Sequence, residues 1–201
     1  MIPRQPVSRT NGARRWRAVF LCLLISLSVL ISQPCSSAEE EAILKDILVT
    51  SKADTLVVYG RVARCFTQDM EAAIMAGVPT TFTFLFHLYQ TRSLWFDRKV
   101  AAVEIHHTIK YDIVKKTFYV STSADKEPAA FQDLEGAKRA MSEFNTTIPL
   151  PKDSIKRELP HYLNMKAKLD KVRLPLGMEY VFFFVSLWDF ETAWFRQPVS
   201  F

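Results

Sequence analysis

The sequence predicts an α+β fold: a meandering, curved antiparallel β-sheet of about six to eight strands with two or three short helices. Apolar and polar residues alternate with a period of two over residues 80–92 and 100–114. Two other segments repeat apolar residues at helical spacing, near residues 70 and 137. The order of these elements lacks the regular strand and helix alternation of a parallel sheet, which favours antiparallel pairing.

The first elements are a strand hairpin and a helix. Residues 47–49 and 56–62 are β-rich and are separated by a polar turn at 51–54, a pattern typical of a hairpin. Thr67 can cap the following helix through its side-chain oxygen, and Gly77 is expected to end it. The helix would bury one face, formed by Met70, Ala73 and Ile74.

Two long strands come next, and each has one apolar face. In residues 80–92 the buried face is expected to hold Phe82, Phe84, Phe86 and Leu88. In residues 100–114, His107 falls on the apolar face and His106 on the wet face. Residues 117–122 form a further strand. A sheet with one polar face is typical of antiparallel pairing with one side in solvent.

The C-terminal half continues this pattern with several interruptions. Residues 134–144 have helical spacing through Leu134, Ala137, Met141 and Phe144, and residues 145–160, with three prolines, are predicted to be a long loop. Residues 162–170 alternate as a strand. Residues 178–185 are apolar throughout, so periodicity leaves strand and short helix open. Residues 187–196 are predicted to be a final strand.

The first 38 residues are expected to be a signal peptide. Five arginines precede an uncharged run of 14 residues at 18–31, and Ser36 and Ala38 fit cleavage after Ala38. A membrane-spanning helix needs about 20 apolar residues, so cleavage is favoured over an uncleaved anchor, which stays the alternative. The expected mature chain is a single exported domain, residues 39–201.

Removal of the signal would change the charge and the cysteine content. The chain has 26 Lys and Arg against 21 Asp and Glu, and loss of the five signal arginines leaves 21 against 21. A neutral domain lacks the basic face of a nucleic-acid-binding protein, so we expect no nucleic-acid partner. Cys65 would be the sole cysteine, which excludes an internal disulfide and favours a buried thiol.

Several short motifs carry a family resemblance. They are Ala-Gly-Val-Pro-Thr-Thr-Phe-Thr-Phe at 76–84, Trp95-Phe96-Asp97, Leu169-Asp170 with Leu174-Pro175, and Ser-Leu-Trp-Asp-Phe-Glu-Thr at 186–192. With these motifs after an N-terminal signal, the chain resembles a family of exported bacterial proteins known as domain of unknown function 4390. The resemblance implies the periplasm, or the periplasmic face of the inner membrane, as location. It implies no catalytic residues, and it suggests a membrane sensor kinase as partner from gene neighbourhood.

Polar residues offer few candidates for catalysis or metal binding. Adjacent side chains on a strand point to opposite faces, so His106 and His107 cannot share a metal, and His107 is expected to be a core histidine. Asp189 and Glu191 share a face of the last predicted strand, about 7 Å apart. A hydrolase using His106 with Asp189 or Glu191 is therefore one hypothesis, although a solvated strand face explains the same residues. We expect no cofactor and no metal.

Aromatic residues form the second candidate site. Phe82, Phe84 and Phe86 are predicted to lie on one strand face, and the final strand is predicted to carry on one face Trp188, Phe190, Thr192 and Trp194. These rings can fill a dense core or line a pocket for an apolar, lipid-like ligand. Because the sequence has no catalytic constellation but has a neutral mature charge and a long proline-rich loop, it favours a non-enzymatic protein-interaction module over a lipid carrier or a hydrolase. Membrane contact is expected only through an uncleaved N-terminal segment.

Overall fold

The computed structural model describes residues 41–52, 54–151, 155, 158–170 and 190–201, all within one compact unit. The predictions for the signal peptide with cleavage at Ala38, for residues 178–185, and for Trp188 and Asp189 lie outside these residues. Antiparallel strands dominate the described part, together with two helices, as the alternating patterns predict.

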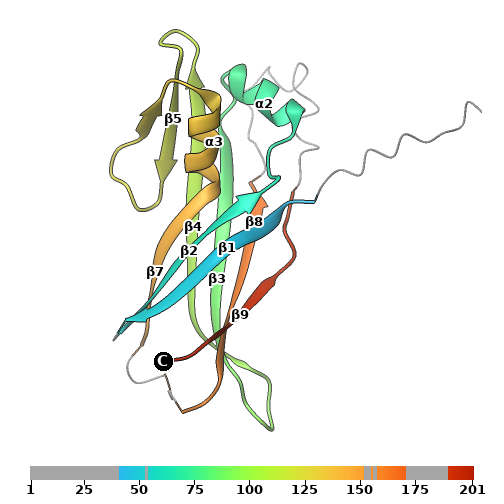
Figure 1. The fold of residues 1–201 in the computed structure, drawn as a ribbon, viewed down its shortest axis with the longest axis vertical. Helices are drawn as coiled ribbons and strands as arrows, with labels where there is room; N and C mark the ends of the chain where they lie inside the picture. Colours follow the sequence, from blue (N-terminus) through green and yellow to red (C-terminus); the bar gives the residue numbers. More distant parts are fainter. Residues whose placement is uncertain (1–40, 53, 152–154, 156–157, 171–189) are drawn as a thin grey trace, which may run out of the picture. The chain divides into compact units, whose positions relative to one another are not determined.

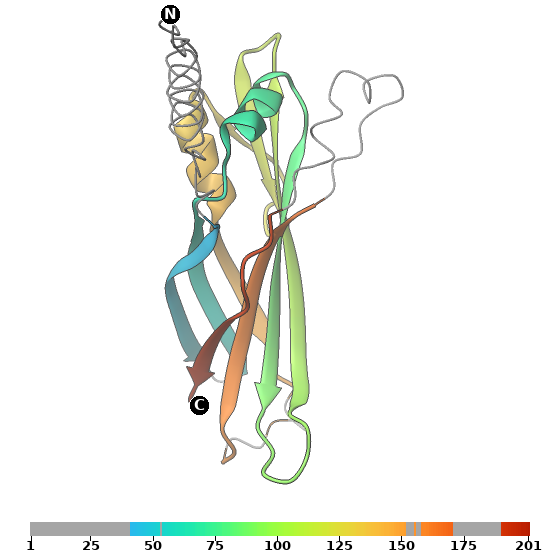
Figure 2. The ribbon, with the colours of Figure 1, turned by 90° about the vertical axis from the view of Figure 1, so that its right-hand side faces the viewer.

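The strands form two sheets rather than the single sheet that the sequence predicts. Three strands pair in the order β1-β2-β7, with bounds β1 Ile43–Lys52, β2 Thr55–Ala63 and β7 Glu143–Pro149. Six strands pair in the order β6-β5-β4-β3-β8-β9, with bounds Ala129–Phe131, Thr117–Thr122, Arg98–Asp112, Thr80–Gln90, His161–Leu169 and Phe195–Val199. The two sheets lie face to face (Figure 1, Figure 2). A sheet whose inner face is this apolar needs a cover, and the smaller sheet supplies it.

The core lies between the sheets and is rich in phenylalanine. Phe82, Phe84 and Phe86 of β3 are each at most 1% exposed. The ring of Phe144, from β7 of the opposite sheet, lies 5.1 Å from the ring of Phe84 and 5.3 Å from that of Phe86. Such tilted aromatic pairs add to the stabilisation from buried area, which suits a chain whose described cysteine is a free thiol. Burial raises the pKa of the Cys65 thiol to about 12.

The two helices begin where the sequence predicts. Helix α2, Gln68–Met75, is capped by Thr67, whose hydroxyl accepts a hydrogen bond from the Met70 amide, and Gly77 follows it with a φ of 85°. Helix α3, Leu134–Ser142, is capped by the Asp133 carboxylate. It packs on β4, β5 and β6 of the larger sheet.

Two C-terminal predictions are wrong. Residues 145–149 are strand rather than loop, and Phe144 belongs to this strand and not to the preceding helix. Alternate side chains of the strand face the core (Phe144, Thr146 and Ile148), so their burial outweighs the low strand propensity of Asn145 and Pro149. Of the described part of the predicted last strand, only Phe195 and Arg196 belong to β9, whereas Glu191 forms an isolated bridge with Lys168 and Thr192 exchanges hydrogen bonds with the Ala167 backbone.

Candidate functional site

A cleft of about 1030 Å³ opens beside β7, where the smaller sheet approaches the larger one. One wall is β7 itself, from Glu143 to Thr147. The facing wall comes from β4 and β5, with Ile105, His107 and Val120, and continues into the loop around Asp125. Within the described residues β7 is the edge of its sheet, because it pairs with β2 and with no second strand. The cleft therefore combines an unpaired strand edge with a partly apolar wall.

Local packing fixes the position of β7. Gly60 lies opposite Phe144 in the register of β2 and β7. A Cβ atom at Gly60 would lie 2.6 Å from Cζ of Phe144 and 2.5 Å from Cδ1 of Ile47. The absence of a side chain at Gly60 thus lets the Phe144 ring reach the core and sets the depth of the cleft wall.

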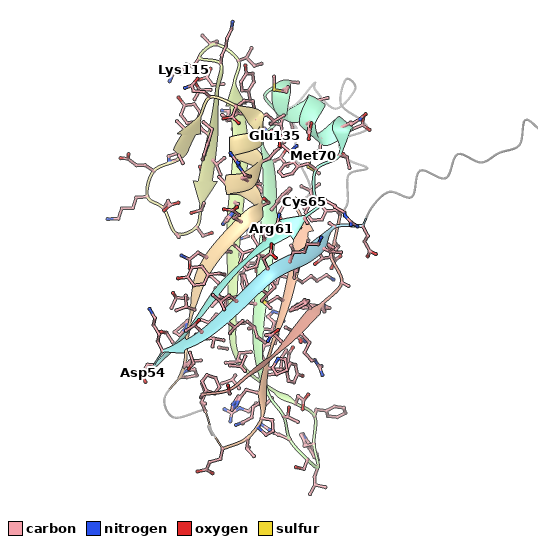
Figure 3. All side chains as sticks on the ribbon, viewed as in Figure 1. Asp54, Arg61, Cys65, Met70, Lys115 and Glu135 are labelled. Carbon is pink, nitrogen blue, oxygen red and sulfur yellow. The ribbon has the colours of Figure 1, made fainter. Side chains whose placement is uncertain are left out.

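The cleft carries an excess of negative charge. Its charged residues are Asp46, Asp125 and Glu143 against Arg61, with His107 at the wall. Arg61 is already paired, since its Nε donates to the Asp46 carboxylate at 2.5 Å. Asp46 reaches this position from a bulge in β1, where its φ is 54°. In Figure 3, Arg61 lies close to the point where α3 leads into β7. The carboxylates of Asp125 and Glu143 remain to attract a cation.

His107 is the core histidine that the sequence predicts. It is 4% exposed, its Nδ1 lies 3.1 Å from the Met141 carbonyl oxygen, and its ring lies 4.9 Å from the ring of Phe84. Burial lowers the pKa of His107, and the hydrogen bond to Met141 opposes this shift only in part. The ring is therefore neutral at pH 7 and forms a weakly polar part of the cleft wall.

His106 lies on the outer face of the larger sheet, in a polar cluster with Thr83 and Asp170. Its Nδ1 is 2.9 Å from the Thr83 hydroxyl, which donates to Asp170 at 2.6 Å. Glu104 also approaches the ring, at 3.7 Å. Thr83 has no exposed surface, so its hydroxyl is out of reach of a substrate. The cluster joins β3, β4 and the end of β8 in a hydrogen-bond network.

The structure does not bring His106 and Glu191 together. Residue pairing places His106 opposite Thr83, Thr83 opposite Lys168, and Lys168 opposite Glu191. Three strand spacings separate the two backbones by about 14 Å. Glu191 instead pairs with Lys166. Asp170 and Glu104 are the acids beside His106. The outward alternation of β8, continued by one residue, was the signal that could have found Asp170.

The predicted aromatic face divides between the core and the outer surface. Phe190 is half-buried and packs edge-on against Phe82 at 4.9 Å, so it joins the core with Phe84 and Phe86. Trp194 is 44% exposed, tilts against His87 at 5.1 Å and lies below the Lys166 ammonium. A depression of about 260 Å³ beside Trp194 is smaller than a typical ligand pocket of about 300 Å³ or more.

Two absences apply to the described residues only. No group of three or more His, Cys, Asp or Glu side chains among them has a geometry that could hold a metal ion. Neither helix in this part of the chain has the length and apolar character needed to cross a bilayer.

The fold and the cleft define a class of protein: a two-sheet antiparallel domain with two capping helices and an acidic cleft along an edge strand. Comparison with known proteins then assigns the chain to a family. The chain belongs to the family described as Domain of unknown function (DUF4390), whose model matches residues 39–198 and confirms the resemblance of its motifs. Neither a curated protein nor a solved structure matches the chain.

Proposed function

We propose that the protein is a non-enzymatic interaction module that binds an extended segment of a partner protein along β7. The observation that carries the proposal is the acidic cleft beside an edge strand. An edge strand presents unpaired N–H and C=O groups, which an added strand can satisfy. The seven residues of β7 are enough to pair with a peptide of similar length.

The lining of the cleft indicates the chemistry of the bound segment. A strand added to β7 would place alternate side chains toward Ile105 and Val120, which favours apolar residues at those positions. The remaining side chains would lie near Asp125 and Glu143, which favours Lys or Arg. The preferred segment therefore alternates apolar and basic residues. A membrane sensor kinase, suggested by the family's gene neighbourhood, is one partner that could supply such a segment outside the cytoplasm.

Two peptides of seven residues test this proposal, one alternating Val with Lys and the other Val with Glu. We expect the lysine peptide to bind the full chain and the glutamate peptide to bind at least about tenfold more weakly, because like charges in the cleft repel. Amide hydrogen exchange gives the location of binding. Exchange should slow at β7, and not at β1, when the lysine peptide is bound.

Charge reversal supplies the matched variants. Asp125→Lys with Glu143→Lys should reverse the peptide preference, whereas Glu41→Lys, outside the cleft, should leave it unchanged. Equal binding of the two peptides, or slowed exchange at strands other than β7, would show that this edge is not the binding site.

A further inference from the structure

The loop between β3 and β4 exposes three consecutive large apolar side chains. Leu94 is 96% exposed, Trp95 74% and Phe96 87%. The loop lies beyond the ends of the neighbouring strands (Figure 1), so these side chains form a protruding tip. Scattered apolar residues are normal on a protein surface, but contiguous exposed groups of this size mark a binding surface.

A second loop extends the tip. The Thr91 amide donates to the Pro160 carbonyl at 2.9 Å, which fixes the segment before β8 against the start of the tip loop. Leu159 of this segment is 38% exposed and adds a fourth apolar side chain at the same end of the domain. Both loops connect to the ends of paired strands, β3 and β8, so the tip stands on a rigid base.

Among the described residues, the charges around the tip are mostly positive. Arg92, Arg98 and Lys99 flank the three apolar residues in the sequence, and Arg98 and Lys99 are exposed at the start of β4. Asp97 is the acid within the loop, and it is already bound, since it accepts a hydrogen bond from the Tyr162 hydroxyl at 2.7 Å. Glu158 is an exposed acid of the second loop. The surroundings of the tip therefore complement an anionic surface.

Tyrosines and cations lie directly behind the tip, on the outer face of the larger sheet. Tyr89 and Tyr162 stack with their ring centroids 5.3 Å apart. Arg196 lies 3.9 Å above the Tyr162 ring, and Lys99 lies 5.9 Å from the Tyr89 ring. Tyr and Trp concentrate where a protein meets the headgroup region of a bilayer, and Lys and Arg reach anionic headgroups there.

The opposite end of the domain provides a comparison. The hairpin between β4 and β5 exposes Ile113 at 59% and Val114 at 91%, next to Lys115 (Figure 3). The Ile113 side chain is partly packed against the domain, since it lies beside Gly77. Within the described residues, this hairpin has no tryptophan and exposes two large apolar side chains rather than three, so it serves as the internal control.

We propose that the tip loop, residues 91–97, inserts Leu94, Trp95 and Phe96 into the interface of an anionic lipid bilayer. The basic residues bind the lipid phosphates, and Tyr89, the less buried of the two tyrosines, lies at headgroup depth. This contact is separate from an N-terminal anchor and from the cleft beside β7. Along β4, Arg98 and Ile105 are seven residues apart, about 23 Å, so the tip and the cleft are distinct surfaces.

Fluorescence quenching by lipids with brominated acyl chains tests the proposal in the full chain. The chain contains four tryptophans, including Trp95 and Trp194. With vesicles of phosphatidylglycerol and phosphatidylethanolamine, part of the quenching should disappear in Trp95→Phe and persist in Trp194→Phe. Because the comparison is between single tryptophans, attachment through the N-terminal segment affects both variants equally.

Two further variant sets sharpen the outcome. Leu94→Ser with Phe96→Ser should abolish the quenching assigned to Trp95, whereas Ile113→Ser with Val114→Ser should leave it intact. Replacement of Arg92, Arg98 and Lys99 by Gln should remove the preference for phosphatidylglycerol over neutral phosphatidylcholine vesicles. Equal quenching in the wild-type and Trp95→Phe chains, or a dimer that buries Trp95 without lipid, would overturn the proposal. Neither result would alter peptide binding at β7.

Discussion

The contact between Gly60 and Phe144 predicts that a single methyl group will destabilise the fold and disturb the cleft. In Gly60→Ala the new Cβ would lie 2.6 Å from Cζ of Phe144 and 2.5 Å from Cδ1 of Ile47. The end of Ile47 is half-buried and can rotate away. The Phe144 ring cannot, because it is packed against two buried rings, Phe84 and Phe86.

The magnitude follows from two opposing effects. Overpacking a dense core costs about 1–3 kcal/mol, while replacing a strand glycine returns about 0.5–1 kcal/mol of conformational entropy. We therefore expect Gly60→Ala to lower the free energy of unfolding by about 1–2 kcal/mol, measured by urea denaturation with an unchanged m value. In a Phe144→Leu background the same substitution should cost much less, a coupling of about 1 kcal/mol or more. A Gly60→Ala chain as stable as the wild type, or purely additive effects, would refute the reasoning.

Three further predictions concern other contacts of the fold. Burial lowers the pKa of His107 in the folded chain below its usual 6.5. As the pH falls, the His107 imidazole therefore takes up a proton more readily in the unfolded chain, which favours unfolding. The contribution of His107 to the free energy of unfolding is complete above about pH 6.5 and is lost as the pH falls through the lower pKa of the folded chain. In urea titrations, the free energy of unfolding of His107→Gln should therefore fall less steeply with decreasing pH. Thr67→Ala removes the cap of α2 and should cost about 1 kcal/mol in the same assay. Lys138→Met, which breaks ion pairs to Glu71 and Glu135, should cost about 1 kcal/mol, and less in 1 M salt.

Local patterns in the sequence predict much of the fold. Alternation predicts the buried face of β3 and the strand at residues 162–170, because a strand that is solvated on one side must alternate; Leu163 and Met165 form the buried face of β8. The two ends of helix α2 are predicted by Thr67, which caps its first turn, and by Gly77, which follows its last turn, because residues of these types satisfy the free backbone groups at helix ends. Periodicity, however, says which face is buried and not what covers it. The division into two sheets depends on long-range strand pairing, which cannot be predicted from the sequence of any single segment.

The candidate site was harder to predict, for the same reason. β7 carries Asn145 and Pro149, and the three prolines between residues 145 and 160 are typical of a loop, yet pairing with β2 and burial of Phe144 make β7 a strand. His106 faces outward as predicted, beside Glu104 of the same strand, but only the register of β4, β3 and β8 determines which acid it meets across the sheet. Asp170 reaches it through Thr83, whereas Glu191 does not.

Gly60 connects these points, because it couples the core to the proposed binding edge. β7 has no described strand on its second side, so its position depends on the side chains that it buries, and Phe144 is the largest of them. A displaced Phe144 ring would move the edge backbone against Ile105 and Val120 on the facing wall. Gly60→Ala should therefore weaken the lysine peptide's binding even at low temperature, where the chain stays folded. The tip loop, about 23 Å away along β4, should insert into lipid as before, which separates a local change at the cleft from general unfolding.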